Sequence, residues 1–389
     1  MPFQSIQGNR HSRSNKLMDN KHVTFTYVGP LQSRGRLFKQ IKTLQGAGFE
    51  VDLIAGNTQP IHKDQYGFPI KDMPVDDSGS PLKSFMEQMR FARNAAIQIA
   101  SGDTDVVVCL GLQSLLAGVL AKQRRTNLCL IFDCNELHIE SFSGFAKKAV
   151  WRVLHNYAIK RCDAIIHAES NRLKYFTNHY PVRNTPQIVI ENFPFFVAAD
   201  PVPRDLSGNI RLIYLGGFGD ARYTMELVEA FTDMPDSVSL DFVGFGFKEY
   251  LAKVERRILE TRAQGIRILP AVPHWQIPDL LKGYHIGLGF YKNTNLNNFF
   301  CAPNKIYDYL MNGIPVVTNK YPGLREVVEK NSVGVCLDQV DSKSLRAALA
   351  KIQSDNMHLN ISNEIRKKYS WENQESKYLS LFADCAARK

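Results

Sequence analysis

The sequence predicts an α/β protein made of two Rossmann-like parallel-sheet domains that face each other across a cleft. Three observations predict this class. Short, nearly all-apolar runs alternate with longer stretches of helical spacing, which is typical of parallel strands covered by helices on both faces. The stretch Glu191–Asn209 contains three prolines and no periodicity, and it reads as a linker between domains. The same alternation of runs and helices then starts again.

The expected strands are the apolar runs themselves. In the first half they are Val23–Val28, Val51–Ala55, Val106–Leu110, Leu128–Phe132, Ala164–His167 and Ile188–Ile190. In the second half they are Ile210–Leu215, Leu240–Val243, Ile266–Leu269, Ile286–Leu288, Pro315–Thr318 and Val333–Leu337. Between several of them the apolar residues recur at helical spacing, as in Leu37, Ile41 and Leu44.

We divide the chain into a flexible basic tail (1–21), an N-terminal domain (22–198), a C-terminal domain (199–368) and a closing segment (369–389). Ser370 is expected to cap a helix in the closing segment. That helix places a set of apolar side chains near one face. They are Trp371, Tyr378, Leu379 and Phe382.

Composition and charge limit the class of protein. Of the 389 residues 44% are hydrophobic and 22% are charged, which excludes a wholly disordered chain, a coiled coil or a collagen-like fibre. The formal net charge of +10 favours an anionic partner. The seven cysteines are scattered, with no C-x-x-C pair, and no run resembles a signal peptide or a membrane span. We therefore expect a reduced, cytoplasmic protein.

The cleft between two such domains is expected to hold a phosphate-bearing ligand, because helix N-termini at the carboxyl ends of parallel strands favour anions. The glycine-rich turn Leu215–Arg222 follows an apolar strand there, and Arg222 supplies a permanent charge. A dinucleotide fingerprint fits poorly, because Arg222 takes the third glycine position and Asp241 lies inside a strand. A plain tight turn with a solvated arginine is the alternative.

A second candidate is the segment Asn298–Val317. Pro303 can occupy the first turn of a helix, which places Lys305 near the helix N-terminus. A cation is disfavoured there unless an anion is bound. Asp308 lies three residues on and shares a face with Lys305, so a phosphate-binding cation stands beside a carboxylate that could accept two sugar hydroxyls. A surface ion pair between Lys305 and Asp308 is the alternative.

Read together, these segments resemble the family 4 glycosyltransferases with the GT-B fold. The most specific match is Pro303–Val317, a P-N-K-x-x-(E/D)-Y variant of that family's donor helix. Tyr214–Ala230, Asp241–Gly246, Ile268–Leu281, Tyr321–Val328 and Tyr369–Glu372 also fit, and weaker matches in the first half are Gly29–Arg36, Phe132–Glu136, Ala164–Ser170 and Ile190–Pro194. The resemblance implies that the closing helix crosses back to pack on the first domain.

The resemblance also implies an activity and a site. The reaction is transfer of a sugar from a nucleotide-diphosphate donor to an acceptor hydroxyl, with retention of configuration. Arg222, Lys305 and a helix N-terminus would stabilise the departing diphosphate, with Glu136 near the acceptor. Asp103-Thr-Asp105 reads as a turn, so no metal and no other cofactor is expected. The implied donor-binding residues are Gly29, Gly216, Gly217, Gly244, Ala271, Ala302, Pro303, Asn304 and Asp308.

Two positions depart from the family pattern. Phe300 stands where the family often has a glutamate that holds the sugar, so other groups must recognise the sugar, for example Asn298 or the backbone N–H groups of residues 302–304. Asn135 stands where the first domain usually has a histidine. His138 is close enough in the sequence to be considered as its substitute.

Positive charge gathers between Ser141 and Cys162, which contains no acid. At helical spacing, Ala146, Val150, Val153, Leu154 and Tyr157 form one face, and Lys148, Arg152 and His155 form another. Such a basic amphipathic helix, with Lys147 and Trp151 beside it, indicates binding to an anionic membrane surface. The alternative is a helix whose apolar face is ordinary core and whose basic face is solvated.

On the membrane interpretation the acceptor is a lipid-linked molecule or another glycan. The protein then acts in bacterial surface polysaccharide or glycolipid assembly, on the inner face of the plasma membrane. Charge alone favours a nucleic-acid-binding protein, but no recognised motif supports nucleic acid as a partner. A periplasmic-type sugar-binding protein lacks its signal peptide here. A sugar-nucleotide epimerase of the GT-B fold stays an alternative, and it would release a free product without an acceptor.

Overall fold

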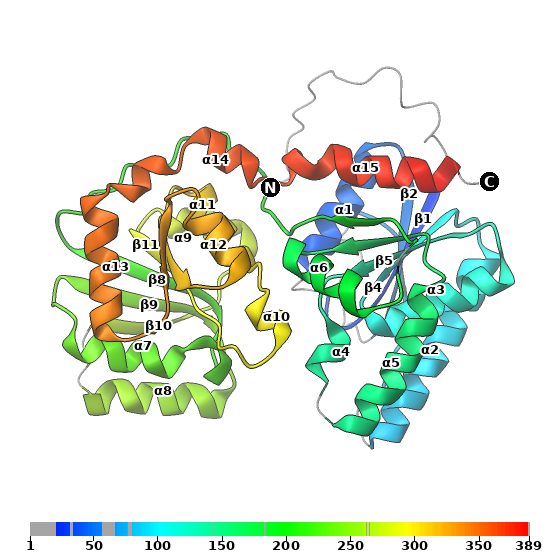
Figure 1. Ribbon diagram of the computed structural model, residues 1–389, viewed down its shortest axis with the longest axis horizontal. Coiled ribbons are helices and arrows are strands. Elements are labelled where there is room, and N and C mark those ends of the chain that lie inside the picture. Colours follow the sequence, from blue (N-terminus) through cyan, green and yellow to red (C-terminus); the bar gives the residue numbers. More distant parts are fainter. Residues whose placement is uncertain are drawn as a thin grey trace.

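The computed structural model describes residues 21–387, apart from 32–33, 57–66, 77–79, 143, 183, 262 and 264. All of the predicted tail except Lys21 lies outside the described residues. Two parallel sheets stand side by side, each with helices on both faces (Figure 1). Residues 190–209, which connect the sheets, contain neither helix nor strand. The architecture confirms the predicted two-domain α/β class.

The first sheet has seven parallel strands in the order β3-β2-β1-β4-β5-β6-β7. They are β1 (His22–Val28), β2 (Glu50–Gly56), β3 (Ile70–Asp72), β4 (Val106–Leu110), β5 (Cys129–Cys134), β6 (Ala164–His167) and β7 (Gln187–Val189). The helices of this half are α1 (Gly35–Gly46), α2 (Pro81–Ser101), α3 (Leu112–Arg124), α4 (His138–Ser141), α5 (Phe145–Ile159) and α6 (Ser170–His179).

The second sheet has six parallel strands in the order β10-β9-β8-β11-β12-β13. They are β8 (Ile210–Gly217), β9 (Val238–Phe245), β10 (Ile266–Pro270), β11 (Ile286–Gly289), β12 (Val316–Asn319) and β13 (Gly334–Leu337). The α-helices of this half are α7 (Thr224–Ala230), α8 (Lys248–Thr261), α9 (Ile277–Leu281), α10 (Leu296–Phe299), α11 (Asn304–Met311), α12 (Pro322–Val328), α13 (Ser342–Ser354), α14 (Asn363–Lys368) and α15 (Glu372–Ala387). Short 3-10 turns are η3 (Asp220–Arg222), η4 (Phe231–Asp233), η5 (His274–Gln276) and η6 (Met357–Asn360).

The central strands are apolar on both faces because both faces are covered. Alternate residues of β4 point to opposite sides of the sheet. Val107 and Cys109 pack in the core with α2 and α3, whereas Val106 and Val108 pack in the core with α1 and α15. All twelve strands expected from the apolar runs are present. The sequence did not predict β3, a three-residue strand at the sheet edge whose Lys71 and Asp72 are exposed.

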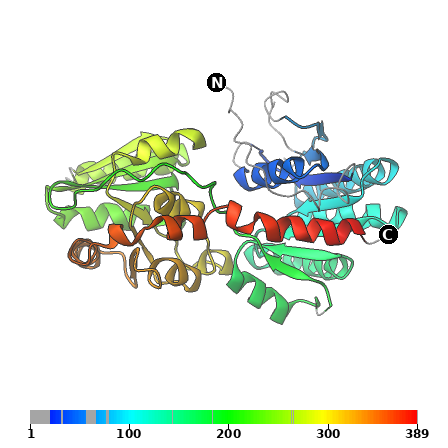
Figure 2. The same cartoon turned by 90° about the horizontal axis from the view of Figure 1, so that it is seen from above.

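The closing helix α15 crosses from the second half of the chain back onto the first domain, as predicted. Figure 2 shows it running along that domain after leaving α14. Trp371, Tyr378 and Phe382 are buried in the same core as β1 and α1. The predicted cap is wrong: the Ser370 hydroxyl donates to the Lys367 carbonyl, and the Ser370 backbone carbonyl accepts the first bond, from the Asn373 N–H.

The orientation of α5 contradicts the alternative in which its apolar face is ordinary core and its basic face is solvated. Its buried residues are Trp151, His155, Ala158 and Ile159. His155, expected on the solvated basic face, is enclosed by the rings of Phe132, Phe176 and Tyr180. The apolar residues Val150, Val153 and Tyr157 are exposed instead.

Candidate active site

A cavity of about 770 Å³ lies in the second half of the chain, at the carboxyl ends of β8, β9 and β10 and the start of α11. Polar and glycine residues from separate loops meet in it. Its lining includes Gly216, Gly217, Arg222, Gly244, Ala271, Pro303, Asn304, Lys305 and Asp308. The structure therefore brings together nine of the residues that the sequence proposed for the donor and the leaving group.

Two glycines let the loops approach one another closely. Gly216 has φ +104°, a conformation that other residues rarely adopt, and a Cβ there would lie 3.6 Å from the Lys305 Nζ. A Cβ on Gly244 would lie 1.9 Å from the Gly216 carbonyl oxygen, which is a severe clash. Glycine at both positions thus keeps the floor of the cavity open to backbone contact with a ligand.

Lys305 is a buried cation without an acidic partner. Its Nζ lies 3.7 Å from the centre of the Tyr214 ring, and among the described residues no carboxylate pairs with it. Burial, reinforced by the nearby Arg222 charge, holds the pKa of Lys305 well below its usual range. The alternative of a Lys305–Asp308 surface ion pair is therefore wrong. An anion bound at this helix start would relieve the unfavourable placement of the cation.

Arg222 supplies the second cation from the turn η3. Its guanidinium lies 4.3 Å from the centre of the Tyr291 ring, and its Nη1 donates to Asn298 Oδ1 at 3.4 Å. Within the described part of the chain it has no acidic partner either. Because Tyr291 also lies 5.5 Å from the Lys305 Nζ, one aromatic ring places both cations on the same side of the cavity.

Asp308 of α11 also lines this cavity. The exposed His274 lies beside Asp308, with its Nε2 3.9 Å from Asp308 Oδ1. Burial raises the pKa of Asp308, and His274 and Lys39 oppose that rise. Among the described residues no side chain donates a hydrogen bond to either carboxylate oxygen, so both can accept hydrogen bonds from a ligand.

A second cavity, of about 390 Å³, continues from the first into the space between the domains. Arg222, Tyr291, Pro303 and Asn304 line both cavities. Asn298 and Ala302 of the second domain also line the second cavity. From the first domain, the second cavity is lined by residues that include Asn135, Glu136, Arg34 and Arg172. Glu136 is thus exposed to the space where an acceptor would meet the donor.

Gly29 and His138 line neither cavity. Gly29 has φ +135°, and a Cβ there would lie 2.5 Å from the Tyr27 hydroxyl. His138 packs beside Gly111, and its Nε2 has no hydrogen-bond partner among the described residues. Burial lowers the pKa of His138, which favours the neutral ring. The histidine is therefore close to the cleft without facing the described cavities.

The sequence did not single out the contacts that hold the two domains together at the site. Arg172 of α6 donates to the carbonyls of Asn135 in its own domain and of Asn297 and Phe300 in the other, at 2.5–2.9 Å. The Leu137 N–H donates to Asn297 Oδ1 at 2.7 Å. No local pattern could reveal these contacts, because the partners lie far apart in the sequence.

Phe300 belongs to this interdomain contact and lines neither cavity. Its ring packs against the core of the first domain, 6.2 Å from the centre of the Tyr175 ring. Phe300→Glu, which introduces the residue that the resemblance to family 4 leads one to expect, should therefore destabilise the protein by roughly 1–3 kcal/mol without raising activity, because it places a carboxylate against apolar side chains. Urea unfolding checks this, with Phe300→Leu as the apolar control. A more active Phe300→Glu enzyme of unchanged stability would contradict it.

The four α5 residues proposed for membrane binding differ from one another in their contacts. Lys148 and Arg152 both pair with Glu140, at 2.7 and 2.6 Å, so their charge is partly neutralised. Trp151 is buried. Lys147 pairs with no acid among the described residues, and its Nζ lies 4.9 Å from the centre of the Phe142 ring. No helix in the described part of the chain is long and apolar enough to cross a membrane.

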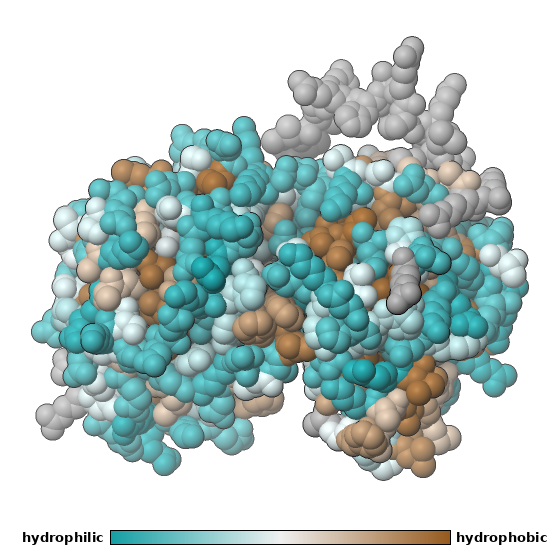
Figure 3. All heavy atoms as spheres, viewed as in Figure 1, coloured by the Kyte–Doolittle hydropathy of each residue, from teal (hydrophilic) through white to brown (hydrophobic). Residues whose placement is uncertain are grey.

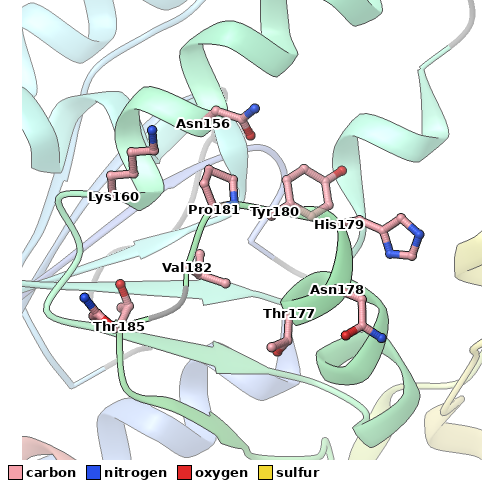
Figure 4. Close-up of a pocket in the computed structure, with 10 residues that line it drawn as sticks. Asn156, Lys160, Thr177, Asn178, His179, Tyr180, Pro181, Val182 and Thr185 are labelled. Carbon is pink, nitrogen blue, oxygen red and sulfur yellow. The ribbon is translucent and has the colours of Figure 1, made fainter.

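A further cavity, of about 850 Å³, lies on the first domain where α5 and α6 end. Figure 4 shows Lys160 and Thr185 on one side of it and Asn178 and His179 on the other. The His179 Nδ1 bonds to the Tyr175 carbonyl of its own helix, and no predicted site residue lies here. Across the described residues, no group of three or more His, Cys, Asp or Glu is placed to hold a metal ion.

Comparison with known proteins gives one family match. Residues 204–370 match the family described as Glycosyl transferases group 1. That segment contains Arg222, Lys305 and Asp308. The comparison with curated protein sequences finds no match.

Several solved structures share the whole two-domain arrangement at low sequence identity. HepE of Anabaena, in complex with UDP and glucose, is 14% identical, with a TM-score of 0.72 over 93% of this chain and 99% of its own. A sucrose-phosphate synthase of Thermosynechococcus elongatus is 14% identical, with a TM-score of 0.71 over 95% and 100%. A glycosyltransferase from Rickettsia africae is 16% identical, with a TM-score of 0.71 over 95% and 100%. The fold is GT-B, and with the matched domain it supports a glycosyltransferase.

Proposed function

We propose, on the premise that residues 204–370 carry a glycosyltransferase group 1 domain in a GT-B fold, that this chain transfers a sugar from a nucleotide diphosphate to an acceptor hydroxyl. The observation that carries the proposal is the pair of cations at the start of α11. Arg222 and Lys305 line one cavity and have no acidic partner in the described part of the chain. A diphosphate is the ligand whose charge and size match such a pair.

In the proposed mechanism the chain stabilises the leaving group. As the bond between the sugar and the diphosphate breaks, negative charge grows on the departing phosphate oxygen. Arg222, Lys305 and the first N–H groups of α11 would neutralise that charge. The two cations supply the charge that a metal ion would otherwise supply, which supports our proposal of metal independence. Retention of configuration and membership of family 4 are further parts of the proposal, supported by the donor-helix pattern.

The nucleotide would lie in the 770 Å³ cavity, with its ribose hydroxyls donating to Asp308. Phe245 and Trp275 are exposed aromatic residues at the rim of this cavity, Trp275 with 73% of its surface accessible. A nucleobase can stack on such rings. UDP is the first nucleotide to test, because HepE, a structural neighbour, was solved with UDP. The other two tryptophans, Trp151 and Trp371, are buried, so Trp275 is the tryptophan that a nucleotide at this rim can contact.

The acceptor would enter from the first domain. Glu136 is exposed in the interdomain cavity and could accept the proton of the attacking hydroxyl or orient it. Asn135 lines the same cavity, and its Oδ1 has no hydrogen-bond partner among the described residues. We propose Asn135 and Asn298, which line this cavity, for the sugar and acceptor side of the site, with His138 buried beside Gly111 outside the cavity lining.

We further propose a glycan or lipid-linked acceptor in bacterial surface polysaccharide or glycolipid assembly, with the protein cytoplasmic and peripheral on the inner membrane face. The exposed apolar residues of α5 support this proposal. The pairing of Lys148 and Arg152 with Glu140 means that Lys147 carries more of any attraction to anionic lipid.

Two alternatives are separable by simple assays. A GT-B-fold epimerase would release a free sugar product without an acceptor, whereas a transferase is stimulated by its acceptor. A nucleic-acid-binding protein would bind random DNA with strong salt dependence.

Asp308→Ala is expected to weaken nucleoside diphosphate binding by about 10- to 100-fold, because hydrogen bonds to a charged group contribute about 1.5–3 kcal/mol. A thermal-shift screen of UDP, GDP, ADP, CDP and dTDP finds the nucleotide, since a ligand at 100 times its Kd adds about 2.7 kcal/mol of stability. Asp279→Ala is the matched control, because the Asp279 side chain is exposed and does not line the cavity. No stabilisation of the unaltered protein by any of the five would count against the proposed function.

A further inference from the structure

An apolar groove separates α2 from α5 on the first domain, beside the start of α3. It has a volume of about 560 Å³ and its walls are mainly apolar and aromatic. Among the residues that line it are Leu82, Phe85, Phe142, Val150 and Trp151. The Trp151 ring packs 5.8 Å from the centre of the Phe85 ring and 6.1 Å from that of Phe142, which gives the groove an ordered aromatic wall.

The rim of the groove is also apolar and faces solvent. Leu82 and Val150, which line the groove, are 69% and 51% exposed. Met86 of α2 and Phe145 and Val153 of α5 are exposed on the same two helices without lining the groove. Figure 3 shows hydrophobic side chains gathered at this lower end of the first domain. A contiguous exposed apolar surface of this kind marks a binding site for an apolar ligand or partner.

At two places in the sequence, a residue that lines the groove follows closely after a residue that lines the interdomain cavity. Leu110 lines the interdomain cavity and Leu112 lines the groove. Ser141 lines the interdomain cavity and Phe142 lines the groove. One end of the apolar groove thus lies beside the polar space that holds Glu136. A molecule with a polar head in the cavity could extend an apolar tail into the groove.

We propose that this groove binds the hydrocarbon chain of an anionic, lipid-linked acceptor whose reacting hydroxyl lies in the interdomain cavity. The proposal rests on the proposed function and names its acceptor class. The walls are helices, whose backbone groups bond within each helix, so an extended peptide finds no strand edge to pair with. Lys147 lines the groove without an acidic partner among the described residues, which suits a phosphate between the chain and the sugar.

The test uses n-alkyl phosphates from hexyl to dodecyl, below their micelle concentrations, titrated into the full chain by calorimetry. Each methylene that the groove buries should lower the Kd by up to about fourfold, until the groove is filled. Val150→Asp and Leu82→Asp should weaken dodecyl phosphate binding by at least tenfold, because each places a charge on a residue that lines the groove. Leu259→Asp, an equally exposed leucine on α8 of the other domain, should leave it unchanged.

Each variant is checked by its melting temperature and by UDP binding, both of which should equal those of the unaltered protein. A Kd that does not depend on chain length would overturn the proposal. The proposal would also be overturned if the protein binds vesicles, Val150→Asp abolishes that binding, and monomeric alkyl phosphates do not bind. That outcome would identify the surface as a membrane-docking face. A dimer that Leu82→Asp dissociates would equally overturn it. Failure of all five nucleoside diphosphates to bind would remove the transferase assignment, whereas failure of the alkyl series alone would remove only the assignment of the groove.

Discussion

Lys305→Met should lower kcat by about 10²- to 10³-fold, the effect expected when one preorganised donor to a developing anion is removed. Lys305 is held against Tyr214 at the start of α11 and has no acidic partner in the described chain, so its interaction with the leaving diphosphate is not weakened by a competing carboxylate. Release of nucleoside diphosphate from the nucleotide sugar identified by the thermal-shift screen measures the rate. Lys292→Met is the matched control, because Lys292 belongs to the neighbouring loop but pairs with Glu226 at 2.5 Å.

The low pKa of Lys305 adds a pH signature to the same prediction. Burial and Arg222 depress it in the free protein, and a bound diphosphate raises it again, so binding takes up a proton. Affinity should therefore fall as the pH rises above the pKa of Lys305 in the free protein. Calorimetry in buffers of different ionisation enthalpy measures the proton uptake, which Lys305→Met should abolish. A Lys305→Met enzyme with unchanged kcat and unchanged proton uptake would contradict the proposed role.

Trp371→Ala should lower the free energy of unfolding by about 3–5 kcal/mol, the usual cost of removing a buried tryptophan. Trp371 is fully buried in the core of the first domain, its indole N–H donates to Thr43 Oγ1 at 2.8 Å, and its backbone N–H donates to the Pro194 carbonyl at 2.8 Å. The residue therefore joins α15, α1 and the linker at one point. Urea unfolding measures the loss.

A second substitution at the same position separates packing from the hydrogen bond. Trp371→Phe keeps most of the ring and loses the donor to Thr43, so it should cost less than Trp371→Ala. Hydrogen exchange should show α15 opening before the rest of the domain in Trp371→Ala. Equal stability of Trp371→Ala and the unaltered protein would show that α15 contributes nothing to the first domain.

Local patterns explain which parts of the fold could be predicted. The central strands were predictable because burial on both faces makes them continuous apolar runs. The edge strand β3 was not, because its exposed Lys71 and Asp72 carry no such signal. The buried face of α5, which includes Trp151 and His155, was not predicted, because the apolar spacing marked the stripe that contains Val150 and Val153. Hydrophobic spacing identifies a stripe, but only tertiary packing decides whether that stripe or its neighbour is covered.

The same distinction holds at the site. The glycine turn, Arg222, Lys305 and Asp308 belong to two short segments whose strand and helix boundaries are readable, so their meeting could be predicted. Tyr291, which places both cations, and Arg172 and Asn297, which join the domains, act through contacts distant in the sequence. No periodicity or motif marks such residues.

The central claim is that a diphosphate lies against the start of α11 between two cations. A crystal structure of the protein with the nucleoside diphosphate selected by the thermal-shift screen tests it directly. We predict the diphosphate within hydrogen-bond distance of both the Lys305 Nζ and the Arg222 guanidinium, with the ribose at Asp308. A nucleotide bound elsewhere, or bound in this cavity with neither cation in contact with phosphate, would contradict the account.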